Sequence, residues 1–480
     1  MKPSKKNILT TGLAVVLAAA AVLGGTFGYL QDSTENVTNT FKANQVTVSL
    51  KETTGDAYEI IPGTEQEKDP TVTVTNTVDA YVYVQVTDTT QDLVDYTIAE
   101  GWMQLDGYEN IYYREVGKDD ETKMFSVLED DTVRYDAALT NENMTDKTDL
   151  KLIFQAYAIQ KAPFADAAAA FAAKDSVIAD DADTVKTAIA QGQPVVLAED
   201  VELSGNLIIN DNENAVIDLN GKTLTIGAMA QNGGSLTVRN GNIDTDVFQV
   251  SGENNSLILD GVTTDAYVLI SEGTENSTVD ITNSTITGAL YAFSTNAAVA
   301  GSGQDVVVNI TNSTLTALPD PNPNADAADC TGVLFNICGT LNITNSTIYG
   351  GRQAVIVRCG TANITNSTLV KTSAVKDSEI DKKKDYTVSD WEDGNRVVAS
   401  VLTIGNYKEG ASASYAEDAA VTLSKVTLTR QEGDTMPTVY LGSNADYSAS
   451  LSCSDESVAK TDIGYSGTSC YFNSELLTGE

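Results

Sequence analysis

One short segment has oxygen-bearing side chains at the alternating spacing of a calcium-binding loop: Asp320, Asn322, Asn324 and Asp326. Carboxylate and amide oxygens are the ligands that calcium prefers, and calcium takes about six to eight of them. The segment lacks the glycine that such loops use for their sharp turn. We therefore consider it a candidate calcium site, with a stiff, solvated, proline-containing loop as the alternative, and we expect no other cofactor.

Trp391 is a candidate for binding a sugar ring. It follows three consecutive lysines at residues 382–384, in a chain that is otherwise strongly acidic. An exposed indole offers a flat apolar face on which a sugar can stack. The alternative is that Trp391 folds back onto the neighbouring coil and anchors a charged loop.

Carboxylates and cations in the second half of the chain could serve a polysaccharide hydrolase or lyase. A hydrolase needs two carboxylates across a substrate cleft, and a lyase needs a basic residue that removes a proton. The candidates are Asp260, Asp280, Arg352, Arg358 and Lys371. No pair of aspartates recurs at a cleft-like spacing along the sequence, so we predict no catalytic residue and no enzyme.

Composition excludes several other chemistries. The 480 residues include no histidine, which removes the commonest general base, the commonest zinc ligand and every Ser-His or Cys-His nucleophile pair. The formal net charge of −38 repels nucleic acids and anionic membranes. We therefore expect no nucleic-acid partner.

The five cysteines match no zinc-binding spacing. Cys338 and Cys359 occupy equivalent positions, 21 residues apart, in two copies of a repeat. On adjacent coils their Cα atoms would lie within the range that a disulfide needs. Cys453 and Cys470 could close a local disulfide near the C-terminus. Both pairs are disulfide candidates, and reduced, stacked thiols are the alternative for the first pair.

The elements that must position these residues are predicted by a repeat. The phrase Ile-Thr-Asn-Ser-Thr occurs four times, beginning at Ile281, Ile310, Ile343 and Ile364. Around such corners apolar and polar residues alternate with the period of a half-buried strand, and asparagine tolerates the positive φ of a tight corner. Looser upstream copies take Asn220, Asn240 and Asp260 as corner residues. A repeat of about 21 residues suits one coil of a parallel β-helix, and longer steps are coils with inserted loops.

The repeat suggests clear boundaries for the second half of the chain. We expect a right-handed parallel β-helix over residues 193–450 and a C-terminal segment at 451–480. Residues 161–192 would form an alanine-rich linker and a short capping helix, with Asp183 as its N-cap. That helix would cover the open edge of the first coil.

The first third of the chain is predicted to hold an export signal and a β-sandwich. Residues 1–28 combine three lysines with an apolar run at 13–23 that is too short to span a bilayer comfortably. Cleavage is expected between Gly28 and Tyr29, so the chain would meet the membrane only transiently; a retained anchor is the alternative. Residues 29–160 alternate apolar and polar in short runs, which is typical of a β-sandwich. The whole fold is therefore expected to be all-β.

Several runs in this region resemble, in order, the SipW-dependent leader and mature start of the TasA/camelysin-type proteins of Gram-positive bacteria: residues 23–32, 38–41, 44–50, 69–76, 80–86, Trp102 with 106–108 and 112–113, and 154–160. The resemblance covers roughly residues 10–175. It implies secretion, and assembly in which residues 29–50 are donated as a strand to the next subunit. The protease association of the camelysin name is not transferred, because no histidine is available for the usual zinc site.

These features predict an exported, non-enzymatic cell-surface or biofilm-matrix protein of a Gram-positive bacterium. Its partners would be further copies of itself or other matrix proteins, with glycans as a further candidate. A glycan-binding adhesin is the first alternative. A carbohydrate-active β-helix enzyme, either a lyase or a hydrolase, is the second.

Overall fold

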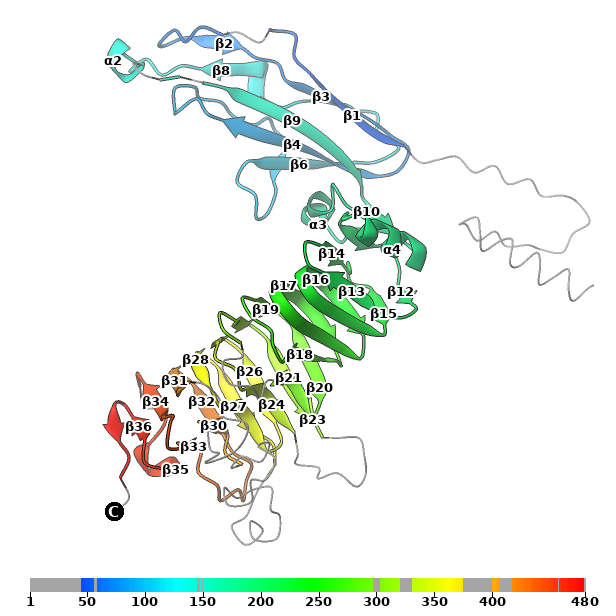
Figure 1. The fold of residues 1–480 in the computed structure, drawn as a ribbon. Helices are drawn as coiled ribbons and strands as arrows, with labels where there is room; N and C mark the ends of the chain where they lie inside the picture. The colour runs from blue at the N-terminus through cyan, green and yellow to red at the C-terminus, as the bar shows by residue number, and fades with distance from the viewer. Residues whose placement is uncertain are drawn as a thin grey trace, which may run out of the picture. The chain divides into compact units, whose positions relative to one another are not determined.

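The structure is a computed structural model that describes residues 45–478, apart from 56–57, 145–146, 149, 297–302, 320–329, 374–398, 406–416 and 456. Strands dominate the described residues, and most of them belong to one large, mainly parallel sheet (Figure 1). The predicted all-β class, with a parallel β-helix and a short capping helix, is confirmed.

The N-terminal module is built from antiparallel strands. One sheet holds β1 (Val46–Lys51), β3 (Thr71–Asn76) and β7 (Met124–Ser126), a second holds β5 (Met103–Gln104), β6 (Ile111–Val116), β4 (Ala80–Asp88) and β9 (Leu152–Gln160), and β2 (Glu65–Glu67) pairs with β8 (Thr132–Arg134). A 3-10 turn at Glu129–Asp131 and helix α2 (Asn141–Met144) lie in its connections.

One core joins the two larger sheets of this module. The inward valines of β3 (Val72 and Val74) and of β4 (Val82 and Val84) belong to the same buried cluster, as the alternating sequence predicts. Trp102 joins that cluster, and its indole nitrogen donates to the carbonyl oxygen of Ser126 at 2.8 Å. Trp102 is therefore a packing residue.

Residues 161–192 are more structured than a linker. Helix α3 (Ala167–Ala172) packs Phe171 against Tyr83 of β4, with ring centroids 5.0 Å apart. Strand β10 (Val177–Ala179) pairs in parallel with β11 (Val195–Leu197) and so already belongs to the β-helix. Helix α4 (Ala182–Ala190) follows, with Val185 and Ala188 buried, and it is the predicted capping helix.

The N-cap of α4 is Asp181, so the prediction of Asp183 was wrong by two residues. The Asp181 carboxylate accepts from the backbone N–H of Thr184 at 2.7 Å, and the backbone of Asp181 is extended, as an N-cap requires. These hydrogen bonds lower the pKa of Asp181. The sequence offers two aspartates two residues apart, and the first one satisfies the free helical N–H groups.

The coils of the β-helix have three faces, which we name A, B and C. Face A contains β11, β14 (Asn214–Asp218), β19 (Thr278–Thr282), β22 (Val307–Thr311), β25 (Thr340–Thr344), β28 (Gly360–Thr365), β31 (Ala419–Ser424), β34 (Ala449–Cys453) and β36 (Cys470–Phe472). Face B contains β12 (Val201–Leu203), β15 (Thr223–Ile226), β20 (Thr285–Ala289), β23 (Thr314–Leu318), β26 (Thr347–Gly350), β29 (Thr368–Lys371) and β32 (Thr427–Thr429).

Face C contains β13 (Leu207–Asn210), β18 (Tyr267–Ser271), β21 (Tyr291–Asn296), β24 (Thr331–Phe335), β27 (Gln353–Val357), β30 (Leu402–Ile404), β33 (Val439–Gly442) and β35 (Ile463–Ser466). Strands β16 (Ala228–Asp244) and β17 (Val247–Thr264) each continue through all three faces. The parallel register continues past residue 450, the predicted end, through a 3-10 turn (Lys460–Asp462) to β36, which β37 (Glu475–Leu476) then pairs in antiparallel fashion. The later coils lack the Ile-Thr-Asn-Ser-Thr phrase but keep its apolar alternation.

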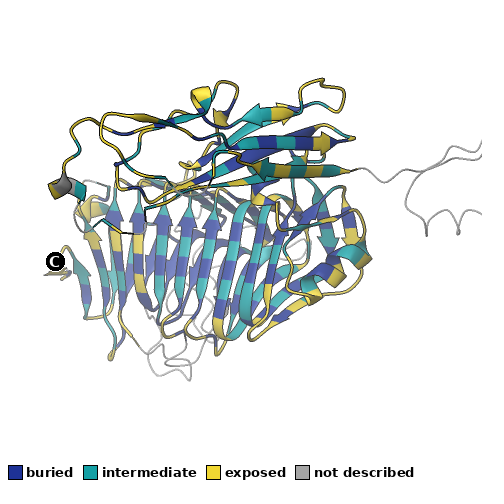
Figure 2. Ribbon diagram, turned by 90° about the horizontal axis from the view of Figure 1, so that it is seen from above, coloured by how far each residue is buried: buried dark blue, intermediate teal, exposed yellow. Residues whose placement is uncertain are grey.

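Each residue of the Ile-Thr-Asn-Ser-Thr phrase has a defined place in the coil. Taking the third copy as the example, Ile343 points into the core and is fully buried, and Asn345 forms the corner between faces A and B with φ of 50°. Ser346 turns inward after it, and its hydroxyl accepts from the backbone N–H of Ser313 in the preceding coil at 3.0 Å. Buried and half-buried residues therefore alternate along strands of faces A and B such as β25 and β26 (Figure 2), whereas β24, β27 and β30 on face C are buried throughout.

One corner was misplaced at the sequence level. Asp260 was predicted as a corner residue, but the residue with positive φ in that coil is Gly261, at 64°. Asp260 is instead the last residue before the corner, and it stands opposite Thr282 of the next coil. Because side chains alternate along a strand, this shift by one residue places the Asp260 side chain on the outer side of face A.

Candidate active site

The outer side of face A carries one column of amide side chains that ends in a carboxylate. Asp280, Asn309, Asn342 and Asn363 occupy equivalent positions of four successive coils. The residues next to them, such as Ile281 and Ile310, point into the core and are fully buried, so the four polar side chains point outward. We call these four residues the amide ladder.

Hydrogen bonds run through the amide ladder in one direction. The Asn309 side-chain nitrogen donates to the Asp280 carboxylate at 2.7 Å, Asn342 donates to the oxygen of Asn309 at 2.8 Å, and Asn363 donates to the oxygen of Asn342 at 3.0 Å. An amide has two N–H donors and an oxygen with two acceptor positions. Each ladder amide therefore keeps hydrogen-bonding capacity for a ligand that lies on the face.

Hydroxyl groups flank the ladder on both sides. Outward threonines occupy the column on the corner side, at Thr282, Thr311, Thr344 and Thr365. A second column, on the other side, contains Thr278, Val307, Thr340 and Thr361. The result is a flat strip of amides and hydroxyls in which each coil repeats the previous one at about 4.8 Å.

A second carboxylate lies diagonally across from Asp280. The register pairs Ile258 with Asp280 and Asp260 with Thr282, so Asp260 and Asp280 are one coil and two residues apart. Strand spacing and rise place their Cα atoms about 8 Å apart. The Asp260 carboxylate accepts from the Asn283 side-chain amide at 2.9 Å, and this amide belongs to the corner between faces A and B.

The neighbouring coil contributes a cation. Arg239 stands opposite Asp260 in the register, and its guanidinium binds the Asp218 carboxylate at 2.9 Å. Asp218 is buried and also accepts from the backbone N–H of Asn220 at 2.9 Å, so its role is structural. Asp260 and Asp280 are the outward carboxylates of this strip, each held by an asparagine amide.

Two outward carboxylates at this separation can hydrolyse a glycosidic bond. In inverting glycosidases the two carboxyl groups are about 6.5–9.5 Å apart, which leaves room for the attacking water, whereas retaining enzymes bring them to about 5 Å. Both side chains leave the same face of one sheet, so we take the Cα separation as the approximate scale of their carboxyl separation. The spacing therefore suits inversion, and the amide ladder beside it supplies binding positions for a polymer.

The cations considered with these aspartates at the sequence level lie elsewhere. Arg352 and Arg358 are buried at the two ends of β27 on face C. Lys371 is fully buried at the end of β29, where its ammonium binds the Asp434 carboxylate at 2.7 Å and the Ala399 carbonyl oxygen at 2.6 Å. Burial lowers the pKa of Lys371, and the hydrogen bond to Asp434 opposes that shift. None of these three side chains joins the carboxylate pair.

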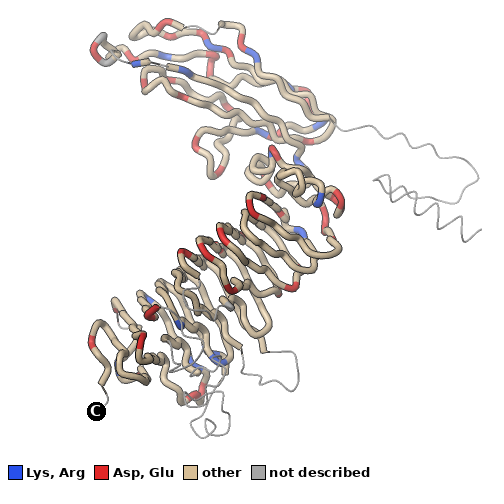
Figure 3. The backbone as a smooth tube through the Cα atoms, viewed as in Figure 1, with Lys and Arg blue, Asp and Glu red and all other residues tan. Residues whose placement is uncertain are grey.

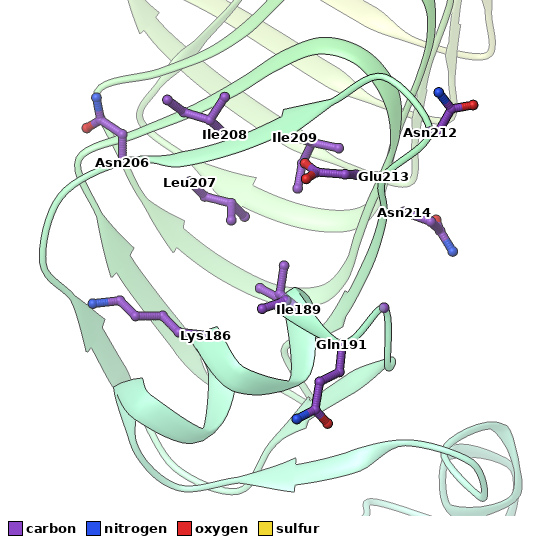
Figure 4. A pocket seen from close by; sticks show the side chains of 12 residues that line it. Lys186, Ile189, Gln191, Asn206, Leu207, Ile208, Ile209, Asn212, Glu213 and Asn214 are labelled. Atoms are coloured by element: carbon purple, nitrogen blue, oxygen red, sulfur yellow. The ribbon is translucent and has the colours of Figure 1, made fainter.

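The cavities considered next are formed by described residues, and none of them is lined by the strip on face A. A cavity of about 730 Å³ lies between α4 and β13, and Figure 4 shows Ile189, Leu207 and Ile209 on its walls. Its acidic residue, Glu213, already accepts from the backbone N–H of Asn210 at 2.7 Å. A second cavity, of about 440 Å³, is in the N-terminal module beside Lys68. A third, of about 260 Å³, lies beside α4 and has Asp183 as its acidic residue. None of these three contains a carboxylate pair, so we place the chemistry on face A.

Several predicted sites lie outside the described residues. They are the calcium candidate at Asp320, Asn322, Asn324 and Asp326, the glycan candidate Trp391, and the cleavage site at Gly28 and Tyr29. In the part of the chain that the structure describes, no group of three or more Cys, Asp and Glu side chains could hold a metal ion. The same part contains no helix that is both long and apolar enough to cross a membrane.

The two predicted cysteine pairs have different outcomes. The sulfur atoms of Cys338 and Cys359 approach to 2.9 Å in adjacent coils. Cys470 instead stands opposite Ala449, which is four residues before Cys453 on the same strand. All five cysteines, Cys338 and Cys359 included, are thiols in the structure. Four residues of strand correspond to about 13 Å, so the structure does not bring Cys453 and Cys470 together.

Comparison with known proteins gives matches among solved structures. No protein-family model matches the chain, and no curated protein matches it. The Dettilon tailspike protein is 10% identical with a TM-score of 0.25, over 62% of this chain and 68% of that one. The catalytic unit of a GH87 alpha-1,3-glucanase from Streptomyces thermodiastaticus is 10% identical with a TM-score of 0.28, over 89% of this chain and 83% of that one.

These findings correct the predicted function. The structures found are a tailspike and glycoside hydrolase catalytic domains, so the prediction of a non-enzymatic cell-surface or biofilm-matrix protein is not retained. The prediction that the chain is not an enzyme is corrected with it. Because the identities and TM-scores are low, the acting residues have to be found in the geometry of this chain.

Proposed function

We propose that this protein is an extracellular, carbohydrate-active β-helix protein that hydrolyses a polysaccharide on face A. The observation that carries the proposal is the diagonal pair Asp260 and Asp280 at the end of the amide ladder. The pair supplies the two carboxylates of a glycoside hydrolase, and the ladder with its threonine columns supplies donors and acceptors that match sugar hydroxyl groups.

The two carboxylates take different roles in this proposal. We assign Asp260, the carboxylate one coil beyond the end of the amide ladder, as the base that takes a proton from water. Asp280 stands beside Ile258 and binds the first ladder amide, Asn309. We assign Asp280 as the acid that protonates the leaving glycosidic oxygen. Water then attacks the anomeric carbon from the opposite side, and the configuration inverts.

The site of action follows from the first residues of the chain. The three lysines and the apolar run at residues 13–23 are typical of an export signal, and the resemblance to SipW-dependent leaders supports secretion by a Gram-positive bacterium. A hydrolase of polymers has to meet its substrate outside the cell, so the proposed activity and the proposed location agree.

The test is hydrolysis of a polysaccharide panel by the purified protein. The panel contains alpha-1,3-glucan, beta-1,3-glucan, cellulose, xylan, polygalacturonate and alginate, and new reducing ends are measured. Asp260→Asn and Asp280→Asn should each lower the rate by about 100-fold or more, because each removes a proton-transfer group. Asp244→Asn, which changes an exposed carboxylate on face B, is the matched control and should keep full activity. No hydrolysis of any panel member, or full activity in both face A variants, would overturn the proposal.

A further inference from the structure

The strip on face A is poor in positive charge. From Thr278 to Thr365 the three outward columns of face A contain one charged side chain, Asp280, among the strands that the structure describes. Asp260 adds a second negative charge in the preceding coil, and Arg239 in the coil before that is bound to Asp218. Acidic residues also outnumber basic ones along the described coils of the β-helix (Figure 3), and the whole chain carries a net charge of −38.

The negative charge of the face A strip, together with the lack of a free cation among its described residues, discriminates between charged and uncharged polysaccharides. A polyuronate such as pectate or alginate carries a carboxylate on every sugar, and these carboxylates would lie beside Asp260 and Asp280 without a free cation on the strip. Like charges brought together in this way oppose binding. Apart from Val307 and the two aspartates, an uncharged glycan meets amides and hydroxyls, which can exchange hydrogen bonds with its hydroxyl groups without a charge penalty.

The direction of the ladder also defines how a chain would lie. The amides continue from Asp280 toward the C-terminal coils, through Asn309, Asn342 and Asn363, and the columns stay in register over these coils. The coils repeat at about 4.8 Å, so a chain that lies along the coil axis meets equivalent groups at each coil. A polymer laid along the coil axis would therefore be held over several sugars on one side of the cleavage point.

We propose that the substrate is a neutral, uncharged polysaccharide, bound along the amide ladder parallel to the coil axis, with Asp260 and Asp280 at one end of the bound segment. This inference rests on the proposed function, because it names the substrate class of the same site. It predicts binding that is independent of ionic strength, since no ion pairs form.

Binding should be measured separately from cleavage. The double variant Asp260→Asn/Asp280→Asn is sedimented with insoluble alpha-1,3-glucan, beta-1,3-glucan and cellulose, and native gel retardation is followed with polygalacturonate and alginate, at about 0.05 M and 0.5 M salt. In the same background, Asn309→Ala/Asn342→Ala should weaken binding to the neutral glycan by about tenfold, which corresponds to the loss of one or two neutral hydrogen bonds. Thr316→Ala, an outward residue of the same coil on face B, is the matched control and should change nothing.

Each outcome has a defined meaning. The inference is supported if the protein binds a neutral glycan equally well at both salt concentrations. This binding should be lost in the ladder variant and kept in the Thr316→Ala control. Binding to polygalacturonate or alginate in preference, or to no glycan of the panel, overturns it. Neutral binding by the double variant together with no hydrolysis by the wild-type protein would refute the proposed hydrolase and leave the inferred ligand class standing.

A separate observation concerns Cys338 and Cys359. Both are buried, they form a small cluster of their own between faces C and A, and their sulfur atoms are 2.9 Å apart. Their positions are equivalent in adjacent coils, so their Cα atoms are about 4.8 Å apart, inside the range of about 4.4–6.8 Å that disulfides use. Little movement is needed to bond the two sulfur atoms.

We propose that Cys338 and Cys359 form a disulfide in the exported protein, which would link two adjacent coils covalently. Each thiol gives up its proton, the new sulfur–sulfur bond forms, and the two electrons reduce the disulfide of a thiol–disulfide oxidoreductase to a dithiol. The bond would form during folding, before the coils close over the sulfur atoms.

Mass spectrometry of the denatured protein tests this assignment. Iodoacetamide without reductant should modify three of the five cysteines, namely Cys330, Cys453 and Cys470, and prior reduction should raise the number to five. A cross-linked peptide pair containing Cys338 and Cys359 should appear only in the unreduced sample. Five modified cysteines without reductant, or a cross-link between other cysteines, would overturn the proposal.

Discussion

At the scale of single residues, the inward serine of each repeat forms hydrogen bonds with buried backbone groups at the corner of the coil. The hydroxyl of Ser346 accepts from the backbone N–H of Ser313 and donates to the carbonyl oxygen of Thr344 at 2.7 Å, and Ser284 and Ser313 make the equivalent contacts in earlier coils. These serines are buried, so no water replaces them. The serine column therefore satisfies backbone groups where each coil turns its corner.

Removal of one such hydroxyl should destabilise the β-helix. Ser346→Ala leaves the Ser313 N–H buried without its acceptor, and an unsatisfied buried donor costs about 1–3 kcal/mol. Equilibrium unfolding by urea measures the change. Thr347→Ala, one residue later on the half-exposed side of face B, should stay within about 0.5 kcal/mol. Equal effects for the two variants would contradict the role given to the serine column.

Partly buried Tyr96 makes the N-terminal module sensitive to alkaline pH. Burial raises the pKa of Tyr96 to about 12, and nearby Asp88 adds to the shift. An unfolded tyrosine loses its proton near pH 10, so between about pH 10 and 12 the folded state binds more protons than the unfolded state. The stability contributed by the neutral phenol is complete below pH 10 and is lost as the pH rises.

Unfolding free energies at pH 8 and pH 11 test that sign. The wild-type protein should be less stable at pH 11, and Tyr96→Phe should reduce the difference because phenylalanine does not titrate. The pKa of Lys371 is lowered, so this residue makes the folded state more stable as the pH rises, opposite to Tyr96. The pH dependence of wild-type protein therefore has to be compared with that of Tyr96→Phe. A difference between pH 8 and pH 11 that Tyr96→Phe leaves unchanged would show that this tyrosine does not contribute.

At the scale of elements, helix α4 shows how a cap determines where a helix begins. Asp181 and Asp183 are chemically equal candidates in the sequence, and the structure uses Asp181, whose carboxylate reaches the Thr184 N–H. Asp183 is left in the first turn, where it interacts only with the positive end of the helix dipole. The two positions therefore contribute by different mechanisms.

The pair of aspartates offers a matched comparison. Asp181→Ala should lower the stability of the β-helix by about 1 kcal/mol, because it removes the N-cap. Asp183→Ala should cost about 0.5 kcal/mol or less, because only a dipole interaction near the surface is lost. Urea unfolding monitored by far-UV circular dichroism ranks the two variants. The reverse order would mean that the helix begins at the residue that the sequence first suggested.

At the scale of the whole molecule, much of the β-helix could be predicted because its sequence repeat shows which residues occupy equivalent positions in successive coils. The Ile-Thr-Asn-Ser-Thr copies identify the inward isoleucine, the corner asparagine and the strand on either side, and the structure confirms each of them. The capping helix followed from its apolar face. The insertions between coils were visible as irregular steps between corners.

The sequence names Asp260 and Asp280 among the hydrolase candidates, but their pairing could not be predicted, because it depends on register between coils. Asp260 was assigned to the corner by analogy with the asparagines, and that assignment removed it from the outer column. A glycine such as Gly261 accepts positive φ more easily than an aspartate, and this was the available signal. Once Gly261 is the corner, Asp260 and Asp280 lie on the same face and form a pair. The carboxylates are 20 residues apart in the sequence, and only the coil geometry brings them together.

The stereochemistry of the first product tests the central claim most directly. Proton NMR during hydrolysis of a soluble neutral glycan fragment shows the anomeric configuration of the new reducing end before it equilibrates. The Cα atoms of Asp260 and Asp280 are about 8 Å apart, and this spacing predicts inversion of the anomeric configuration. Asp280→Asn should abolish the NMR signal of the new reducing end. Retention of configuration, or undiminished product from Asp280→Asn, would contradict the assignment of this pair.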